Sequence, residues 1–198
     1  KKTTELIKLF NDKVNQGKTF RVNQMLQDFS GDILTIFDAD VRISTDQAMN
    51  LIIKQFNHSD KVMLVGGEVR VYPPETFFQK SIYTAYEVHY ETREVLKGGH
   101  NIHGNAGACL SLKKEFAKNL SIPECITEDT FIYFSCLQKG GIFRHAKGAL
   151  VQHHLAKNLK DYFKQIFRTH PEAVNVMQSQ YFGDLVEKEF FRPRGFYY

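Results

Sequence analysis

Two aspartates, Asp38 and Asp40, directly follow an apolar run over residues 33–37 that is typical of a buried strand. Ligand sites of α/β proteins gather at the carboxyl ends of strands, so this pair is expected to face a crevice. Oxygen donors two residues apart suit a hard divalent cation such as Mg²⁺ or Mn²⁺, which could also bind a diphosphate. The alternative is a polar turn in which Asp40 caps the segment that follows.

A second acidic group, Thr127-Glu128-Asp129, opens a predicted helix over residues 127–139. Asp129 could act as a general base if its position brings it close to a substrate hydroxyl. The dipole of the helix is expected to lower the pKa of Asp129. By themselves these residues are more typical of an ordinary helix start, because Thr is a good N-cap and acidic side chains complement the dipole in a first turn.

Two glycine-containing segments are further candidates for binding an anion. Gly17 and Lys18 lie between predicted helices over residues 3–15 and 22–29, and a lysine is a point charge for a phosphate. The common alternative is a helix C-cap followed by a solvated lysine. The stretch 98–108 contains four glycines, and its backbone N–H groups could hold an anion or a sugar. A flexible loop is the alternative there.

The last third of the chain adds two more features. His153 and His154 follow a short predicted strand and could bind a metal, although an isolated histidine is more often a hydrogen-bonded surface or core residue. The predicted helix over residues 158–169 has one apolar face, formed by Leu159, Tyr162, Phe163, Ile166 and Phe167. Packing of this face into the core is the favoured interpretation. Contact with an anionic membrane surface is the alternative, because lysines follow the opposite face.

Predicted strands and helices alternate along the chain. The strands cover residues 33–37, 62–65, 68–72, 108–112, 142–145 and 149–153. The longer helices cover residues near 44–56, 75–96, 127–139 and 158–169, and the segment from 172 begins as a helix. This alternation predicts an α/β fold around a mainly parallel sheet flanked by helices.

The composition narrows the class of protein. The 198 residues are 42% hydrophobic and 24% charged, as in a globular domain, and the net charge of +4 comes without a Lys/Arg block that could track nucleic acid. Three cysteines with no C-x-x-C spacing exclude a disulfide scaffold and a thiolate zinc site, and they fit a reducing, cytoplasmic compartment. No apolar run reaches the roughly 20 residues that a membrane span needs.

The order of the motifs decides between these alternatives. Gly17-Lys18 is followed by Asp38-Ala39-Asp40, the segment 104–108, Thr127-Glu128-Asp129 and finally Gln165-x-x-Arg168. This order over residues 17–170 resembles the family 2 glycosyltransferases of the GT-A fold. These enzymes use nucleotide-activated sugars and invert the anomeric centre.

The resemblance implies a role for each motif residue. Asp129 would be the catalytic base that deprotonates the acceptor hydroxyl, with Glu128 assisting it. Asp40 would bind the divalent metal (Mn²⁺ or Mg²⁺) that bridges the donor diphosphate, and Asp38 would contact the nucleotide ribose or the metal. His153, less certainly His154, would complete the metal shell. The other donor-binding residues would be Lys18, Gly104, Asn105, Gln165 and Arg168.

The resemblance also sets expectations for the whole chain. Thr169 stands where the family's Q-x-x-R-W motif has Trp, which argues against processive polymer synthesis. The family's first strand normally precedes the region where this chain begins, so residues 1–170 are expected to be a catalytic domain without its N-terminal part. Residues 171–198 would be a helical and aromatic extension of that domain.

The expected activity is metal-assisted transfer of a sugar from a nucleoside diphosphate sugar, with a UDP-sugar as the first donor to consider. The acceptor would be a glycan, a lipid or another molecule with a hydroxyl group. A peripheral membrane contact, or transmembrane helices flanking the domain in a parent protein, would fit the membrane-associated members of the family. The alternatives are a sugar-phosphate nucleotidyltransferase and a non-catalytic domain that binds a sugar nucleotide or a partner.

Overall fold

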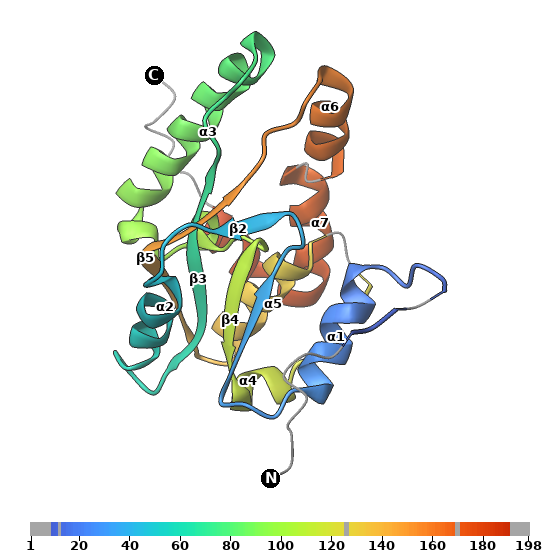
Figure 1. Ribbon diagram of the computed structural model, residues 1–198. Coiled ribbons are helices and arrows are strands. Elements are labelled where there is room, and N and C mark those ends of the chain that lie inside the picture. Colours follow the sequence, from blue (N-terminus) through green and yellow to red (C-terminus); the bar gives the residue numbers. More distant parts are fainter. Residues whose placement is uncertain (1–8, 12, 125–126, 169–170, 191–198) are drawn as a thin grey trace.

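A computed structural model of the chain describes residues 9–11, 13–124, 127–168 and 171–190. Its centre is a five-stranded sheet with the strand order β1-β4-β3-β5-β2 (Figure 1). In chain order the strands are β1 (Ile33–Phe37), β2 (Val41–Ile43), β3 (Val62–Val71), β4 (Cys109–Lys113) and β5 (Ile142–His153).

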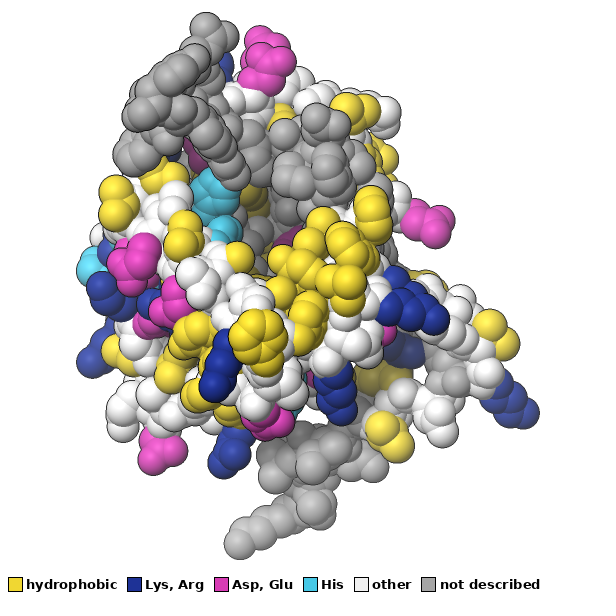
Figure 2. Space-filling view, turned by 90° about the horizontal axis from the view of Figure 1, so that it is seen from above, with side chains coloured by type: hydrophobic (Ala, Val, Ile, Leu, Met, Phe, Trp, Pro, Cys, Tyr) yellow, Lys and Arg dark blue, Asp and Glu magenta, His cyan; other side chains and the backbone are white. Residues whose placement is uncertain are grey.

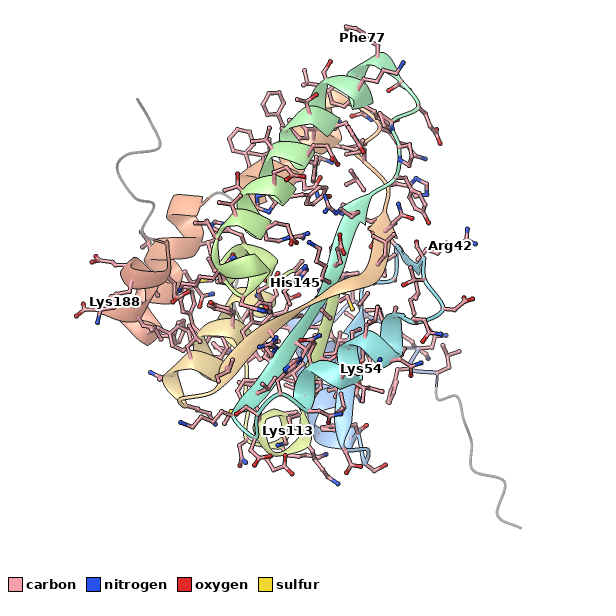
Figure 3. The ribbon with its side chains drawn as sticks, turned by 90° about the vertical axis from the view of Figure 1, so that its left-hand side faces the viewer. Arg42, Lys54, Phe77, Lys113, His145 and Lys188 are labelled. Atoms are coloured by element: carbon pink, nitrogen blue, oxygen red, sulfur yellow. The ribbon has the colours of Figure 1, made fainter. Side chains whose placement is uncertain are left out.

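Helices cover both faces of this sheet. They are α1 (Lys18–Asp28), α2 (Ala48–Phe56), α3 (Phe77–Val95), α4 (Lys114–Lys118), α5 (Glu128–Gln138), α6 (Leu159–Arg168), α7 (Pro171–Phe182) and α8 (Asp184–Phe190). Two short 3₁₀ turns, η1 (Lys97–Gly99) and η2 (Ile102–Gly104), follow α3. Figure 3 shows the sheet nearly edge-on, with Lys54 of α2 on one side and Lys188 of α8 on the other.

The core is divided between the two faces of the sheet. On one face, buried side chains of α1, α4, α5, α7 and α8 pack against the strands. On the other face, Ala48 and Ile52 of α2 pack on small and β-branched side chains of β3 and β5. A third cluster joins α3 to the end of β3 and to Leu155, just after β5. The predicted α/β class is therefore confirmed, and strands covered on both faces explain the continuous apolar runs of the sequence.

The direction of the strands differs from the prediction of a mainly parallel sheet. Among the described strands, β3 and β5 pair in parallel, whereas the β1–β4, β3–β4 and β2–β5 pairs are antiparallel. An apolar run that is buried on both faces shows that a strand is central but carries no information about its direction. The sheet is mixed because β4 runs against both of its neighbours.

Two pairs of short predicted strands are single long strands. Residues 62–65 and 68–72 form one strand, β3, that continues through Gly66 and Gly67. A Cβ atom on Gly66 would lie 2.8 Å from Gly104 O, so this glycine lets the 98–108 stretch rest directly on the sheet. Likewise β5 continues across the predicted gap at residues 146–148, where its register with β3 shifts.

The N-terminal prediction is wrong where the structure describes it. Residues 9–11 and 13–17 are not helical, and the rest of the predicted helix over 3–15 lies outside the described residues. Gly17, with φ of +82°, is the N-cap of α1 and so begins a helix instead of ending one. Glycine occurs at both the N-terminal and the C-terminal ends of helices, so the local pattern does not show whether Gly17 begins or ends one.

The two C-terminal helices belong to the same core as the sheet. Phe182 of α7 lies with its ring centroid 5.1 Å from that of Phe131 in α5, and Val186 of α8 is buried in the same cluster. Helix α8 also contacts α5 near its own end, where Glu189 Oε2 accepts a hydrogen bond of 2.8 Å from Tyr133 Oη. Among the described residues, no helix is long and apolar enough to cross a membrane.

Candidate active site

Asp38 lies at the carboxyl end of β1, as the sequence predicts. Its backbone N–H donates to Ala108 O (3.3 Å), because the end of β1 lies beside the start of the antiparallel strand β4. The Val41 N–H donates to Asp38 O (3.4 Å) and closes a turn into β2. Asp38 is partly buried, whereas Ala39 and Asp40 are exposed on the turn. The two aspartates therefore meet different environments.

Lys18, the first residue of α1, joins two acidic groups. Its Nζ atom lies 2.7 Å from Asp38 Oδ1 and 2.5 Å from Glu128 Oε1. Partial burial disfavours the charged form of this lysine, but its hydrogen bonds and ion pairs with Asp38 and Glu128 outweigh that effect and raise its pKa. The ammonium group therefore stays charged and bridges α1, the β1–β2 turn and α5.

Asp129 is held by the backbone of the glycine-rich stretch. The Gly107 N–H donates to Asp129 Oδ2 (2.9 Å), and the Thr130 N–H donates to Asp129 Oδ1 (2.8 Å). Asn105 Nδ2 donates to the backbone oxygen of Asp129 (2.9 Å). A Cβ atom at position 107 would lie 3.0 Å from Asp129 Oδ2, so glycine allows the backbone to approach the carboxylate this closely.

The electrostatic environment of Asp129 differs from the expectation based on the helix dipole. Desolvation by burial, followed by the neighbouring charge of Glu128, raises the pKa of Asp129. Hydrogen bonds from Thr130 and Gly107 and the charge of Lys18 oppose this effect without reversing it. The prediction of a lowered pKa is wrong, because burial and the neighbouring Glu128 carboxylate raise the pKa of Asp129.

These groups share one open cleft of about 630 Å³. Lys18, Asp38, Gly107, Glu128 and Asp129 all line it, so the structure brings together motifs that lie far apart in the sequence. Sequence analysis did not single out several other lining residues, namely Gln16, Thr19, Phe20, Ile122 and Glu124.

Asn23 binds the backbone of Ile122 and so holds the segment around residue 122 at this cleft. Its Nδ2 donates to Ile122 O (2.7 Å), and its Oδ1 accepts from the Ile122 N–H (2.9 Å). These reciprocal bonds fasten α1 to the segment that leads to α5. Asn23 occurs in the Gly17-Lys18-x-x-x-x-Asn23 spacing, but no local pattern indicates its partner.

The predicted metal ligands come close together only in part. Asp40 is exposed, and the next residue, Val41, pairs with His153 across the β2–β5 ladder. The ring of His153 instead has its Nδ1 atom 3.2 Å from His154 O. The described part of the chain contains no group of three His, Cys, Asp or Glu side chains that could hold a metal ion. His154 is exposed.

The carboxylates still fit one kind of metal site. Mg²⁺ is commonly bound by one or two carboxylates together with substrate phosphates, and it seldom needs a cage made only of protein groups. Asp38 and Asp40 on their turn provide hard oxygen ligands of this type. The residues present therefore fit a metal that binds together with a phosphorylated ligand.

The remaining predicted donor-binding residues lie outside the cleft lining. Gly104 and Asn105 are buried: a Cβ atom on Gly104 would lie 2.0 Å from Gly99 O, and Asn105 supports the backbone of Asp129. Gln165 lines a separate shallow groove between α3 and α6, with Tyr86, His89 and Tyr162. Arg168 ends α6, and its side chain lies outside the described residues.

The apolar face of α6 is mostly exposed, which differs from the favoured interpretation of core packing. Tyr162 contacts Phe78 of α3, with ring centroids 6.1 Å apart. The side chains of Leu159 (55% exposed) and Phe167 (72% exposed), together with Phe163 and Ile166, face solvent. Figure 2 shows hydrophobic side chains gathered at the surface at this end of the molecule.

Comparison with known sequences gives the class of protein. A profile of the family described as Glycosyltransferase like family 2 matches residues 3–170. The match covers most of the chain, which therefore belongs to this family. No curated protein sequence matches the chain.

Two solved structures have a similar fold. One is a mannosyltransferase from Pyrobaculum calidifontis in complex with GDP-Man and Mn²⁺: the TM-score is 0.65 at 14% identity, and the similarity covers 87% of this chain and 46% of that one. The other is glucosyl-3-phosphoglycerate synthase from Mycobacterium tuberculosis, in complex with Mn²⁺, UDP and glucosyl-3-phosphoglycerate. Its TM-score is 0.51 at 12% identity, with 83% of this chain and 55% of that one covered.

These likenesses confirm the predicted GT-A type of fold. The chain spans about half the length of each of these proteins. At such low identities the similarity shows the fold alone, and the activity of this chain has to be argued from its own cleft.

The environment of Asp129 leads to a first prediction. In a Glu128→Gln variant, the pKa of Asp129 should fall towards its ordinary value, because the variant removes the neighbouring negative charge that raises it. An NMR titration of the ¹³C-labelled aspartate side chains measures this shift. Glu115→Gln, at an exposed position on α4, is the control and should leave Asp129 unchanged. An unchanged or higher pKa in Glu128→Gln would contradict the assigned cause.

Proposed function

We propose that this chain is the major part of a catalytic domain that transfers a sugar from a nucleoside diphosphate sugar to an acceptor hydroxyl, with inversion at the anomeric carbon. The convergence of Lys18, Asp38, Glu128 and Asp129 on one cleft carries the proposal. It supplies a cation for the leaving diphosphate and a separate carboxylate for the acceptor. Membership of the glycosyltransferase family supports this choice of reaction.

Asp129 is the general base of the proposed reaction. Its raised pKa makes it a stronger base than an ordinary aspartate. Each carboxylate oxygen accepts one backbone hydrogen bond, which leaves further lone pairs for the proton of an acceptor hydroxyl. One base is sufficient for a single displacement, in which the acceptor oxygen attacks the anomeric carbon as the bond to the diphosphate breaks.

Lys18 acts on the donor side of the cleft. The diphosphate gains negative charge as it leaves, and a fixed cation at that place stabilises the transition state. Lys18 is held between Asp38 and Glu128, so its charge is already in the cleft before a donor binds. Gly17 and Thr19, beside it at the start of α1, also line the cleft.

Asp38 and Asp40 would hold a divalent metal, Mn²⁺ or Mg²⁺, together with the donor diphosphate. When bound, such an ion neutralises phosphate charge as a Lewis acid. The mannosyltransferase and the glucosyl-3-phosphoglycerate synthase structures described above contain Mn²⁺, which supports this proposal. His153, which pairs with Val41 next to Asp40, is a candidate for an additional ligand.

Replacing the base gives a second prediction. Asp129→Asn keeps the size of the side chain but cannot accept the proton, so kcat should fall by about 10²- to 10⁴-fold while the Kd of the donor stays near that of the unmodified protein. Labelled UDP- and GDP-sugars with Mn²⁺ provide the assay, and release of a nucleoside diphosphate distinguishes transfer from nucleotidyltransferase chemistry, which releases pyrophosphate. Asp32→Asn, at an exposed position before β1, is the control.

Three outcomes would count against this proposal. Normal turnover by Asp129→Asn would remove its assignment as the base. Pyrophosphate as the product would favour the nucleotidyltransferase. Donor binding without turnover by the full-length protein would favour the non-catalytic binding domain.

The metal proposal gives a third prediction. Asp40→Ala should weaken donor binding at least about tenfold when Mn²⁺ is present and leave it unchanged in excess chelator, because it removes one oxygen ligand. Calorimetric titration of the donor measures both values. Asp46→Ala, which removes an exposed carboxylate before α2, is the control. A donor affinity that does not depend on Mn²⁺ would overturn the metal site.

The exposed face of α6 supports a peripheral membrane contact as a further part of the proposal. Four apolar side chains on this helix are exposed, and Lys157, Lys160 and Lys164 are exposed on or next to the same helix. An amphipathic helix of this composition binds at the boundary between headgroups and acyl chains, and its lysines favour anionic lipid. An acceptor with a lipid part would be reached at such a surface.

Vesicle binding gives a fourth prediction. The double variant Phe163→Ser/Phe167→Ser should bind vesicles that contain anionic lipid at least about tenfold more weakly, because it removes two large apolar side chains from the contact. Co-sedimentation measures the affinity. Phe77→Ser removes an aromatic side chain at the start of α3 that is even more exposed (87%), and it should have no effect. Equal binding of the double variant and the unmodified protein would exclude α6 as the contact.

A further inference from the structure

Gln178, near the end of α7, ties this helix to the start of α5. Its side chain has no exposed surface, and its Nε2 atom donates a hydrogen bond of 3.4 Å to the backbone oxygen of Thr127. The same oxygen accepts the Phe131 N–H (3.2 Å), the first backbone bond of α5. Gln178 therefore holds the residue from which α5 begins, two positions before Asp129.

The fold gains little stability from this amide. The Oε1 atom of Gln178 and the buried Oγ1 atom of Thr127 have no hydrogen-bond partner among the residues that the structure describes. A buried polar atom without a partner costs free energy that an apolar side chain of similar size avoids. Met or Leu at position 178 would thus serve the core at least as well, and the amide calls for another explanation.

A second buried amide holds the same turn from the opposite direction. Asn105, which is 8% exposed, donates from Nδ2 to the backbone oxygen of Asp129 (2.9 Å), and its Oδ1 has no partner in the described part of the chain. The Thr127 side chain makes no capping hydrogen bond to α5. The two amides, on α7 and on the 98–108 stretch, donate to the backbone oxygens of Thr127 and Asp129 and so fix the backbone on both sides of Glu128.

Helix α8 strengthens the same connection. Glu189 accepts a hydrogen bond of 2.8 Å from Tyr133 in α5, and its other carboxylate oxygen lies 3.8 Å from Lys97 Nζ in η1. One side chain thus contacts the helix that carries Asp129 and also Lys97, the residue directly before the 98–108 stretch. Helices α7 and α8 therefore both hold α5, through Gln178 and Glu189.

We propose that Gln178 is a positioning residue for Asp129, and that α7 and α8, which follow the segment matched by the family profile, are a working part of the active site. The amide fixes Thr127 and with it the direction in which the Asp129 carboxylate points. This inference rests on the proposed function, in which Asp129 is the base. A displacement of about 1 Å at a reacting group can lower a rate by about 10²-fold, so a small loss of order at Thr127 is sufficient.

Gln178→Met tests this role in the full-length protein. Met keeps the length and volume of the side chain and removes the donor. We expect kcat to fall at least about tenfold with the KM of the donor unchanged, while Tm stays the same or rises. Gln180→Met makes the same substitution at an exposed position of α7 and should change none of these values.

A second pair of measurements separates this proposal from the assignment of the base. Adding Gln178→Met to Asp129→Asn should cause no further loss of kcat, because the two residues act as a unit. Hydrogen exchange at the backbone amides of residues 129–131 should be faster in Gln178→Met than in the unmodified protein, whatever the activity.

The outcomes are distinguishable. If Asp129→Asn retains full turnover, the assignment of Asp129 as the base fails. If Asp129→Asn is inactive but Gln178→Met keeps its kcat, the positioning role is wrong while the function stands. A fall in kcat accompanied by a fall in Tm and by a further loss in the double variant would mark Gln178 as a structural residue only and overturn the proposal.

Discussion

The ammonium group of Lys18 between the carboxylates of Asp38 and Glu128 is the interaction on which the cleft depends. These residues come from α1, the β1–β2 turn and α5, and without a cation their negative charges would repel one another. The Lys18 side chain is 46% exposed, so solvent screens the ion pairs and their contribution to stability is small. Their effect is geometric, because they hold three separate segments around one volume.

Asp129 shows that this cleft is arranged at some cost to stability. Its pKa is raised in the fold, so the ionised carboxylate is less stable there than in the unfolded chain. Asp129 therefore contributes its full stabilisation of the fold below its pKa in the unfolded chain. That contribution is lost as the pH rises through its higher pKa in the folded protein. Hydrogen bonds from Gly107 and Thr130 offset part of the cost. A loss of stability of this kind is expected at a position where the residue type is selected for chemistry instead of packing.

The side chains of the cleft depend on a layer of residues behind them. Gly66 lets the 98–108 stretch rest on β3, and that stretch places Asn105 and Gly107 against Asp129. From the other direction, α7 and α8 hold α5 through Gln178 and Glu189. The candidate base is therefore fixed by segments that precede and follow it in the chain, and most of these contacts use backbone atoms.

The sequence by itself determined the alternation of strands and helices, Asp38 at the end of a strand and Asp129 in a first helical turn. It also determined the order of motifs over residues 17–170, which resembles that of a glycosyltransferase family. Periodicity depends on neighbouring residues and motif order on positions along the chain, so both can be predicted from the sequence. Only the tertiary structure decided the strand directions, the bridge from Lys18 to Glu128, the rise in the pKa of Asp129, the burial of Gly104 and the contact between Gln178 and Thr127. Each of these depends on which distant segments pack together, and on the desolvation that packing produces, neither of which any local pattern encodes.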